Sequence, residues 1–254
     1  MLFLLSPAKS LNFDIDTSAG KSTIPSFLSD TENLISILKK ISAQDLSQLM
    51  KISDKLASLN YQRFQDFTTP FTAKNSKPAI FVFDGDVYDG IDVENYSKED
   101  LDFAQCHLRI LSGFYGALRP LDLIQPYRLE MGIALKNARG KNLYQFWQEK
   151  ITNYLNAELS KSPENTLLNL ASEEYFSVVD TKKIKGRIIN IIFKEKKGSD
   201  YKIVGIFAKK ARGLMADFII KNKITKAEML KKFTINGYKF HPKFSDKNNW
   251  CFCR

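Results

Sequence analysis

One stretch of the chain, LSGFYGALRPLDLIQPYRLEMG at 111–132, combines cations and carboxylates with glycines and prolines. Its apolar residues do not recur at helical spacing, and its glycines and prolines favour turns, so it predicts a long, shaped loop. On such a loop, Arg119 and Arg128 could bind phosphate or carboxylate through paired N–H donors. Asp122 and Glu130 could equally pair with these arginines and fasten the loop to the body of the protein. From the residues of this stretch alone, both interpretations stay open.

A second cationic group, AKKARG at 208–213, stands between a predicted strand over Lys202–Ala208 and a predicted helix over Ala211–Asn222. At such a junction its three cations would lie near a helix N-terminus, which already offers free N–H groups and the positive end of the helix dipole. Cations at that position favour a nearby anion such as phosphate over a simple solvated run. The three cations are Lys209, Lys210 and Arg212.

Polar residues also follow three predicted strands. SPAK at 6–9 follows Leu2–Ser6 and presents Lys9 on a loop stiffened by proline. GDVYDG at 85–90 follows the run AIFVF and offers Asp86 as a base or orienting acceptor. Asp86 could instead simply cap a turn. NLASEEYF at 169–176 follows a third strand, and its Ser172 could cap the next helix. In α/β proteins, ligands contact the chain at strand exits of this kind.

The net charge of +10 is distributed unevenly along the chain. Residues 1–127 hold 12 Lys and Arg against 16 Asp and Glu, a net charge of −4, whereas residues 128–254 hold 26 against 12, a net charge of +14. Such an asymmetry favours a surface that binds a polyanion in the C-terminal half. The alternative is that these lysines are ordinary solvated residues.

Several functional classes find no support. The two histidines, His107 and His241, and the three cysteines do not form a zinc pattern, so no metal is expected. No hydrolase, phosphate-loop or dinucleotide-binding motif is present, and no cofactor is expected. No apolar run is long enough to span a membrane, and the first residues lack the basic segment of a signal peptide. The few cysteines suit a reducing cytoplasm.

Strand-like and helix-like segments alternate along the chain, which predicts a mixed α/β fold: one compact domain over 1–254, with a mixed sheet and flanking helices. The expected strands are Leu2–Ser6, Ala79–Phe83, Thr166–Leu170, Arg187–Phe193, Lys202–Ala208 and Trp250–Cys253. The expected helices are Asp30–Ile41, Ser97–Leu111, Asn142–Leu159, Ala211–Asn222 and Thr225–Phe233.

Taken together and in this order, SPAKSL, GDVYDG, the 111–132 stretch, LYQFW, NLASEEYF and AKKARGLM resemble the YaaA family of bacterial peroxide-stress proteins. The resemblance covers residues 1 to about 222. It implies a cytoplasmic protein that resists hydrogen peroxide and limits iron-driven damage. It also implies an unusual α/β fold with a helix-hairpin-helix element and a positively charged cleft that binds DNA.

Carried onto this chain, the helix-hairpin-helix falls at Gln44–Phe64, with its turn at 51–53. Such hairpins contact the DNA backbone rather than the bases. The chain lacks the glycines usual at that turn, but Lys51, Lys55 and Arg63 could bind phosphates. It also carries Asp84 where relatives tend to have lysine, so the cleft is expected to have one cation fewer.

The resemblance therefore implies a monomer that binds duplex or structured DNA through these three residues together with Lys9, Arg119, Arg128, Lys209, Lys210 and Arg212. A second hypothesis is an enzyme that modifies nucleic acid, by glycosidic-bond or base chemistry. Its pocket would use Asp86, Tyr88, Tyr115, Asp122 and Glu130. Because no catalytic motif is recognised, binding is preferred to catalysis. A third hypothesis, direct iron binding, has little support from the few metal-ligating residues.

Overall fold

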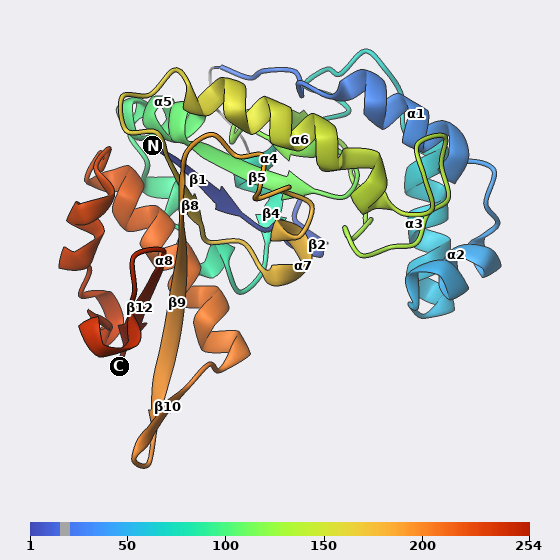
Figure 1. Cartoon of the computed structure of the whole chain (residues 1–254). Helices are drawn as coiled ribbons and strands as arrows, with labels where there is room; N and C mark the ends of the chain where they lie inside the picture. The colour runs from blue at the N-terminus through green and yellow to red at the C-terminus, as the bar shows by residue number, and fades with distance from the viewer. Residues whose placement is uncertain (16–20) are drawn as a thin grey trace.

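The computed structural model describes residues 1–15 and 21–254. A mainly parallel sheet forms its centre (Figure 1). The strand order is β11 (Lys239–Phe240), β12 (Asn249–Cys253), β9 (Arg187–Lys197), β8 (Thr166–Asn169), β1 (Leu2–Leu5), β5 (Leu108–Ser112) and β6 (Gly116–Leu118), with β10 (Asp200–Lys202) paired to β9. The expected mixed α/β fold is thereby confirmed.

Strand β1 occupies the middle of the sheet because its residues are apolar on both faces. Phe3 lies opposite Leu108 of β5 and Leu168 of β8, and all three side chains are buried. A continuous apolar run of this kind is typical of a parallel strand that is covered on both sides. The strands β5, β1, β8, β9 and β12 all run in the same direction, so their carboxyl ends meet along one edge of the sheet.

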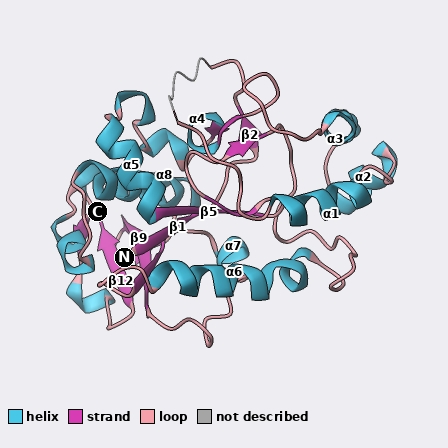
Figure 2. Ribbon diagram, turned by 90° about the horizontal axis from the view of Figure 1, so that it is seen from above, coloured by secondary structure: helices cyan, strands magenta, loops and turns pink. Residues whose placement is uncertain are grey.

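Helices cover both faces of the sheet. Figure 2 shows α6 (Leu143–Leu159) on one side, with α5 (Lys98–His107) and α8 (Gly205–Lys221) on the other. Away from the sheet lie α1 (Leu28–Leu38), α2 (Ala43–Met50) and α3 (Asp54–Asp66). None of the helices in the described ranges combines the length and the apolar content that a bilayer crossing requires.

Short elements fill the connections. Two small antiparallel pairs join β2 (Ser10–Leu11) to β4 (Phe83–Asp84) and β3 (Lys77–Pro78) to β7 (Leu123–Ile124). Two short helices are α4 (Ala79–Val82) and α7 (Glu173–Phe176). Single 3-10 turns form η1 (Tyr88–Gly90), η2 (Val93–Asn95), η3 (Ala227–Lys232), η4 (Ile235–Gly237) and η5 (Pro242–Phe244).

Two of the predicted strands are wrong. The run AIFVF is mostly the short helix α4, and only its last residue, Phe83, belongs to a strand, β4. The amides of Ala79 and Ile80 donate to the carbonyls of Asp122 and Pro120, next to the β3–β7 pair. In the segment Lys202–Ala208, only the first residue belongs to a strand, and α8 begins at Gly205. Its large apolar residues Ile203, Ile206 and Phe207 are solvent-exposed, so they do not mark a buried strand.

Other predictions need correction. The helix expected over Asp30–Ile41 is Leu28–Leu38, and the strand expected over Arg187–Phe193 extends to Lys197. The helix expected to reach Leu111 ends at His107, and its last apolar residues belong to the buried strand β5. The stretch 111–132 is not all loop, since it contains the end of β5 and the short strands β6 and β7. The helix expected over Thr225–Phe233 is the 3-10 segment η3.

Candidate functional site

Polar groups from two central strands meet at the carboxyl edge of the sheet. Ser6 follows β1 directly, and Ser172 lies three residues beyond β8. The amide of Ser172 donates to Oγ of Ser6 at 2.8 Å, and the two hydroxyls are 3.2 Å apart. Oγ of Ser172 also accepts from the amide of Tyr175 and so caps α7. The two strand exits are therefore fastened to each other.

A cavity of about 410 Å³, here called the cleft, opens beside these two exits. It is lined by residues from every strand-exit motif singled out in the sequence and from α8. The lining residues are Ser6, Pro7, Ala8, Lys9, Ser10, Asp84, Gly85, Asp86, Val87, Tyr88, Ser172, Glu174, Tyr175, Lys209 and Arg212. Segments that are distant in the sequence are thus brought to one place.

The turn from Gly85 to Gly90 forms one wall of the cleft. Gly85 has φ of 153°, and the hydroxyl of Tyr88 donates to the carbonyl of Ser6 at 3.1 Å. Burial raises the pKa of Tyr88 well above its ordinary value, so this phenol stays protonated. At Gly90 a Cβ would lie 2.6 Å from the carbonyl oxygen of Lys210, so η1 packs backbone-to-backbone against α8. Asp86 and Tyr88 are therefore both held at the cleft.

Helix α8 supplies two cations to the cleft. Lys209 and Arg212 are three residues apart and lie on one face of the helix. Lys209 pairs with Asp86 at 3.2 Å, whereas Nε of Arg212 is buried without a hydrogen-bond partner. Within the described part of the chain, no carboxylate lies at ion-pair distance from Arg212. Burial lowers the pKa of its guanidinium, because no counter-charge offsets the desolvation.

The AKKARG motif lies within α8 and not at its N-terminus as expected. Since α8 begins at Gly205, the motif falls near the second helical turn, where backbone N–H groups are already bonded within the helix. The phosphate argument based on the helix end therefore does not apply. Lys210 is exposed but does not line the cleft.

Next to the cleft, Arg128 and Glu130 line a small cavity that also contacts Lys9. Oε1 of Glu130 lies 3.0 Å from the Arg128 guanidinium and 3.5 Å from Nζ of Lys9. Glu130 is only 8% exposed, and its second oxygen, Oε2, is buried without a partner. The site therefore holds one unpartnered acceptor at Glu130 and one unpartnered donor at Arg212.

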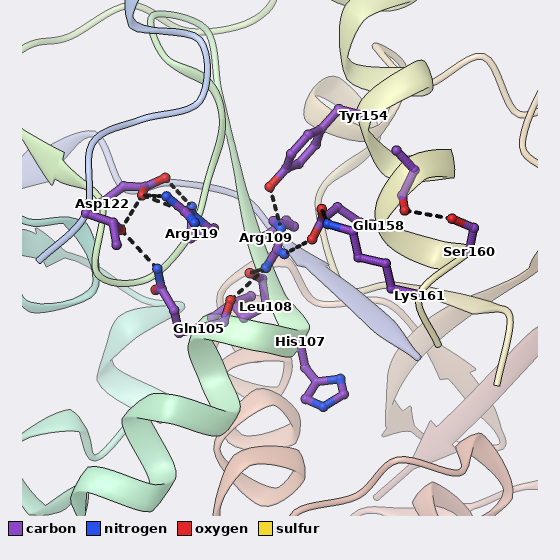
Figure 3. Close-up of polar contacts among 12 residues, drawn as sticks. Gln105, His107, Leu108, Arg109, Arg119, Asp122, Tyr154, Glu158, Ser160 and Lys161 are labelled. Carbon is purple, nitrogen blue, oxygen red and sulfur yellow. Dashed lines mark hydrogen bonds and ion pairs between the residues drawn. The ribbon is translucent and has the colours of Figure 1, made fainter. Parts of the chain in front are cut away.

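Arg119 lies elsewhere, held by the carboxylate of Asp122 (Figure 3). Its guanidinium reaches Oδ1 of Asp122 at 2.9 Å, and its amide donates to Oδ2 at 2.8 Å. Thr23 donates to the same carboxylate. Asp122 is fully buried, and burial raises its pKa despite these contacts. Arg119 and Asp122 do not line the cleft, so this pair fastens the loop, which is the second interpretation above.

Tyr115 also lies in the core and not in a pocket with Asp86. Its hydroxyl accepts from the amide of Gln125 at 2.9 Å, and its ring packs against Phe114 and Tyr127. Of the five residues expected in a pocket, the structure thus places Asp86 and Tyr88 at the cleft and Glu130 beside it, while Tyr115 and Asp122 are fastened inside the fold.

One buried cation escaped sequence reasoning. Arg109 on β5 is only 2% exposed and bonds Glu158 of α6 at 2.5 Å and the hydroxyl of Tyr154 at 2.8 Å (Figure 3). It lies within a run that also fits the end of a helix, so its burial had no sequence signal. Because all of its contacts are internal, Arg109 joins β5 to α6 and is not a ligand-binding residue.

Helices α2 and α3 meet at the expected turn. Lys51 adopts φ of 52°, the conformation that glycine usually supplies at such a turn, and Ser53 caps α3. Lys51 and Lys55 are exposed. Burial, and then the nearby charge of Arg128, lower the pKa of Arg63. In Figures 1 and 2, α7 and β2 lie between α8 on one side and α2–α3 on the other.

Other groups with metal or redox chemistry lie apart from the cleft. The described residues contain no cluster of three or more His, Cys, Asp and Glu side chains suited to a metal ion. His107 bonds the carbonyl of Met1 at 2.8 Å. Cys251 and Cys253 are buried, with their sulfurs 3.6 Å apart. The cleft is also lined by Ser6, Ser172 and Glu174, which the sequence reasoning did not name as binding residues. Their position in the strand-exit motifs SPAK and NLASEEYF is the signal that could have identified them.

Comparison with known proteins gives consistent matches. A family model described as "Peroxide stress protein YaaA" matches residues 1–244. A UPF0246 protein of Teredinibacter turnerae is 52% identical over 254 residues, which is 100% of this chain and 99% of that protein. A UPF0246 protein of Saccharophagus degradans is 53% identical over the same shares of both chains. A UPF0246 protein of Neisseria meningitidis serogroup A is 48% identical, covering 100% of this chain and 98% of its own. The chain therefore belongs to the family of peroxide stress protein YaaA.

Proposed function

We propose that this protein binds DNA during hydrogen peroxide stress, with the DNA backbone in the cleft. The observation that carries the proposal is Arg212, a half-buried guanidinium that lines the cleft, has its Nε buried without a hydrogen-bond partner and lacks a counter-charge. A desolvated cation without a partner is costly, and a phosphate would offset that cost with charge-assisted hydrogen bonds. Lys9, Lys209 and Arg128 add positive charge at the same margin.

The α2–α3 pair extends this surface as a helix-hairpin-helix. Lys51 and Lys55 are exposed on it, and Arg63 lies near enough to Arg128 for their charges to interact. A DNA backbone that follows these cations would pass from the hairpin to the cleft. Contacts of this kind are to phosphates, so we expect binding that is largely independent of sequence. We further propose that the protein acts as a cytoplasmic monomer.

Salt dependence tests the proposal directly. Anisotropy measurements on a labelled duplex at several salt concentrations give the slope of log affinity against log salt, and about five phosphate contacts predict a slope of roughly −4 to −5. Arg212→Gln should weaken binding and make the slope shallower by about 1. The control is Lys161→Gln. Lys161 is exposed just beyond the end of α6, and its neighbour Ser162 accepts a hydrogen bond from the amino group of Met1. It therefore lies near the start of β1, whereas the cleft lies at the end of that strand. Affinity independent of salt would overturn the proposal.

Protection against iron-driven damage then follows from coverage of the DNA. Hydroxyl radicals made by iron next to DNA cleave the sugars they reach, so a bound protein should shield the backbone. Footprinting with iron–EDTA and hydrogen peroxide should show reduced cleavage with the wild-type protein and full cleavage with Arg212→Gln at the same concentration. Equal protection by both proteins would indicate that radicals are scavenged in solution and that DNA is not shielded.

A second candidate function is modification of a base in the same cleft. Two buried groups without hydrogen-bond partners favour it: Oε2 of Glu130 lacks a donor, and Nε of Arg212 lacks an acceptor. A single extruded nucleotide would supply the donor through a base N–H and the acceptor through its phosphate. Asp86, 3.2 Å from Lys209, would be the general base. Incubation with oligonucleotides that carry damaged bases should either release a free base or leave an altered base in the oligonucleotide. Asp86→Asn should abolish this product. No product from any of these oligonucleotides would reject it.

A further inference from the structure

Two carboxylates of the protein already occupy cations at the cleft. Asp86 lies 3.2 Å from Nζ of Lys209. Oε1 of Glu130 lies 3.0 Å from the Arg128 guanidinium and 3.5 Å from Nζ of Lys9. Among the described residues, three of the four cations that line the cleft and the small cavity beside it are therefore paired within the protein. A ligand phosphate would meet these three side chains with part of their charge already offset.

The bonding of Glu130 differs from that of a carboxylate that fastens the fold. Asp122 uses both oxygens, since Oδ1 accepts from Thr23 and the Arg119 guanidinium, while Oδ2 accepts from the amide of Arg119. Within the described part of the chain, Glu130 accepts only through Oε1, and its Oε2 is buried without a donor. A buried carboxylate that is only half bonded costs folding free energy. Stability alone therefore does not account for a carboxylate at this position.

The charge of Glu130 faces a group of cations. Burial, and then the charge of Arg128, lower the pKa of Arg63 on α3, so these two guanidinium groups lie near each other. Lys9 contacts the same carboxylate oxygen as Arg128. Without Glu130 these like charges would repel one another, and a ligand phosphate would be the anion that relieves the repulsion. In the free protein, Glu130 thus occupies the role that a phosphate would have in the complex.

We propose that Glu130 and Asp86 are autoinhibitory anions: they compete with DNA phosphates for the cations of the cleft and so hold its affinity for DNA below what those cations alone would give. Arg212, which has no such carboxylate among the described residues, takes a phosphate without this competition. At Arg128 and Lys209, a phosphate must outcompete the carboxylate. This inference rests on the proposed DNA binding and states how the same site limits it.

The test is duplex affinity, measured by anisotropy at one low salt concentration. Glu130→Gln preserves the size of the side chain and removes its charge, so it should bind the duplex roughly fivefold more tightly than the wild type. Asp86→Asn should gain only about twofold, because Asp86 is 38% exposed and Lys209 is 56% exposed, so solvent screens their pair. The control Glu149→Gln makes the same change in net charge at an exposed position of α6 outside the cleft, and affinity should stay unchanged.

A double-mutant cycle separates competition for cations from general repulsion of DNA. In a Lys9→Gln/Arg128→Gln background, Glu130 has lost both cations that it occupies. Glu130→Gln should then change duplex affinity by less than about twofold. A gain that stays near fivefold in this background would mean that Glu130 simply repels DNA, and the inference would be overturned.

The remaining outcomes are distinguishable. If neither the wild type nor Glu130→Gln binds the duplex, the proposed function is overturned. If the wild type binds and Glu130→Gln binds equally or more weakly, DNA binding stands and the inference is overturned, because Glu130 then positions the cations for DNA. Should Glu130→Gln be unstable, the exposed pair supplies the same cycle: the gain from Asp86→Asn should disappear in a Lys209→Gln background, and its persistence there would overturn the inference.

Discussion

Gly213 of α8 lies against the carbonyl of Val87 so closely that a Cβ at position 213 would be 1.8 Å from the carbonyl oxygen. The contact is between backbones, so no flexible side chain can move aside. It fixes the cleft, because Arg212 immediately precedes Gly213 and Asp86 immediately precedes Val87. One glycine therefore sets the spacing between the two walls that carry these functional groups.

Gly213→Ala should consequently destabilise the protein strongly. Overpacking against backbone costs about 3 kcal/mol of stability. For a chain of this size, such a loss lowers Tm by roughly 6–12 °C. The matched control is Gly205→Ala at the start of α8, where a Cβ would meet nothing within 4 Å. That change should stabilise by about 0.4–1 kcal/mol by restricting the unfolded chain. Thermal unfolding checks both, and equal Tm values would contradict the contact.

Arg212 and Arg119 should respond in opposite ways to the same substitution. Arg212→Met removes a half-buried charge without a partner, so we expect Tm to rise slightly while DNA affinity falls. Arg119→Met leaves the fully buried Asp122 without its guanidinium, so we expect a loss of about 3 kcal/mol and unchanged DNA affinity. Thermal unfolding and anisotropy on the same samples measure all four outcomes. A loss of DNA affinity in Arg119→Met would return this residue to the binding surface.

The strand exits were the predictable part of the site. SPAK and NLASEEYF follow runs whose apolar residues show little alternation, as buried parallel strands do, and in a parallel sheet such exits must lie on one edge. Their convergence could therefore be inferred before any contact was known. The α2–α3 pair was predictable for a similar local reason, since Ser42 and Ser53 cap the two helices.

The roles of the two loop arginines were not predictable. Each has a carboxylate two or three residues away, so local sequence treats them alike. They differ because Thr23, 99 residues from Asp122, completes a buried network around Asp122, whereas Glu130 is left beside Lys9 at the cleft. The helix start at Gly205 was missed for another reason: Ile203, Ile206 and Phe207 are exposed, although their residue types are those of a buried strand.

Asp30 should make the protein more sensitive to acid. Burial alone would raise its pKa, but hydrogen bonds from Lys150 and Arg139 outweigh burial and lower it below the ordinary 3.8. A carboxyl whose pKa is lower in the folded state adds stability above its unfolded pKa, and this stability is lost as pH falls through the folded value. Urea midpoints should therefore drop below about pH 4, and Asp30→Asn should flatten that drop.

Asp122 should act in the opposite direction. Burial raises its pKa, so the folded protein protonates Asp122 more easily than the unfolded chain does. The stability that Asp122 contributes is therefore fully present below its ordinary pKa of 3.8 and is lost as pH rises through its pKa in the folded state. The difference in urea midpoint between the wild type and Asp122→Asn should therefore shift against the wild type as pH rises above about 4. A difference that stays constant over this range would show that Asp122 keeps an ordinary pKa.

The three cysteines should differ sharply in reactivity, which bears on how a peroxide stress protein meets its oxidant. Burial, and then the contact with Cys253, raise the pKa of Cys251 to about 12, and burial also raises that of Cys253. At pH 8 Cys251 is therefore held as the thiol, whereas the thiolate is the form that reacts with iodoacetamide and with peroxide. Cys106 is exposed on α5. Mass spectrometry should therefore find one labelled cysteine in the native protein and three in urea, and Cys106→Ser should leave the native protein unlabelled.

Native labelling of Cys251 or Cys253 at the rate of Cys106 would mean that β12 opens readily. The expected result instead indicates that peroxide reaches Cys106, which does not line the cleft, before the two buried cysteines.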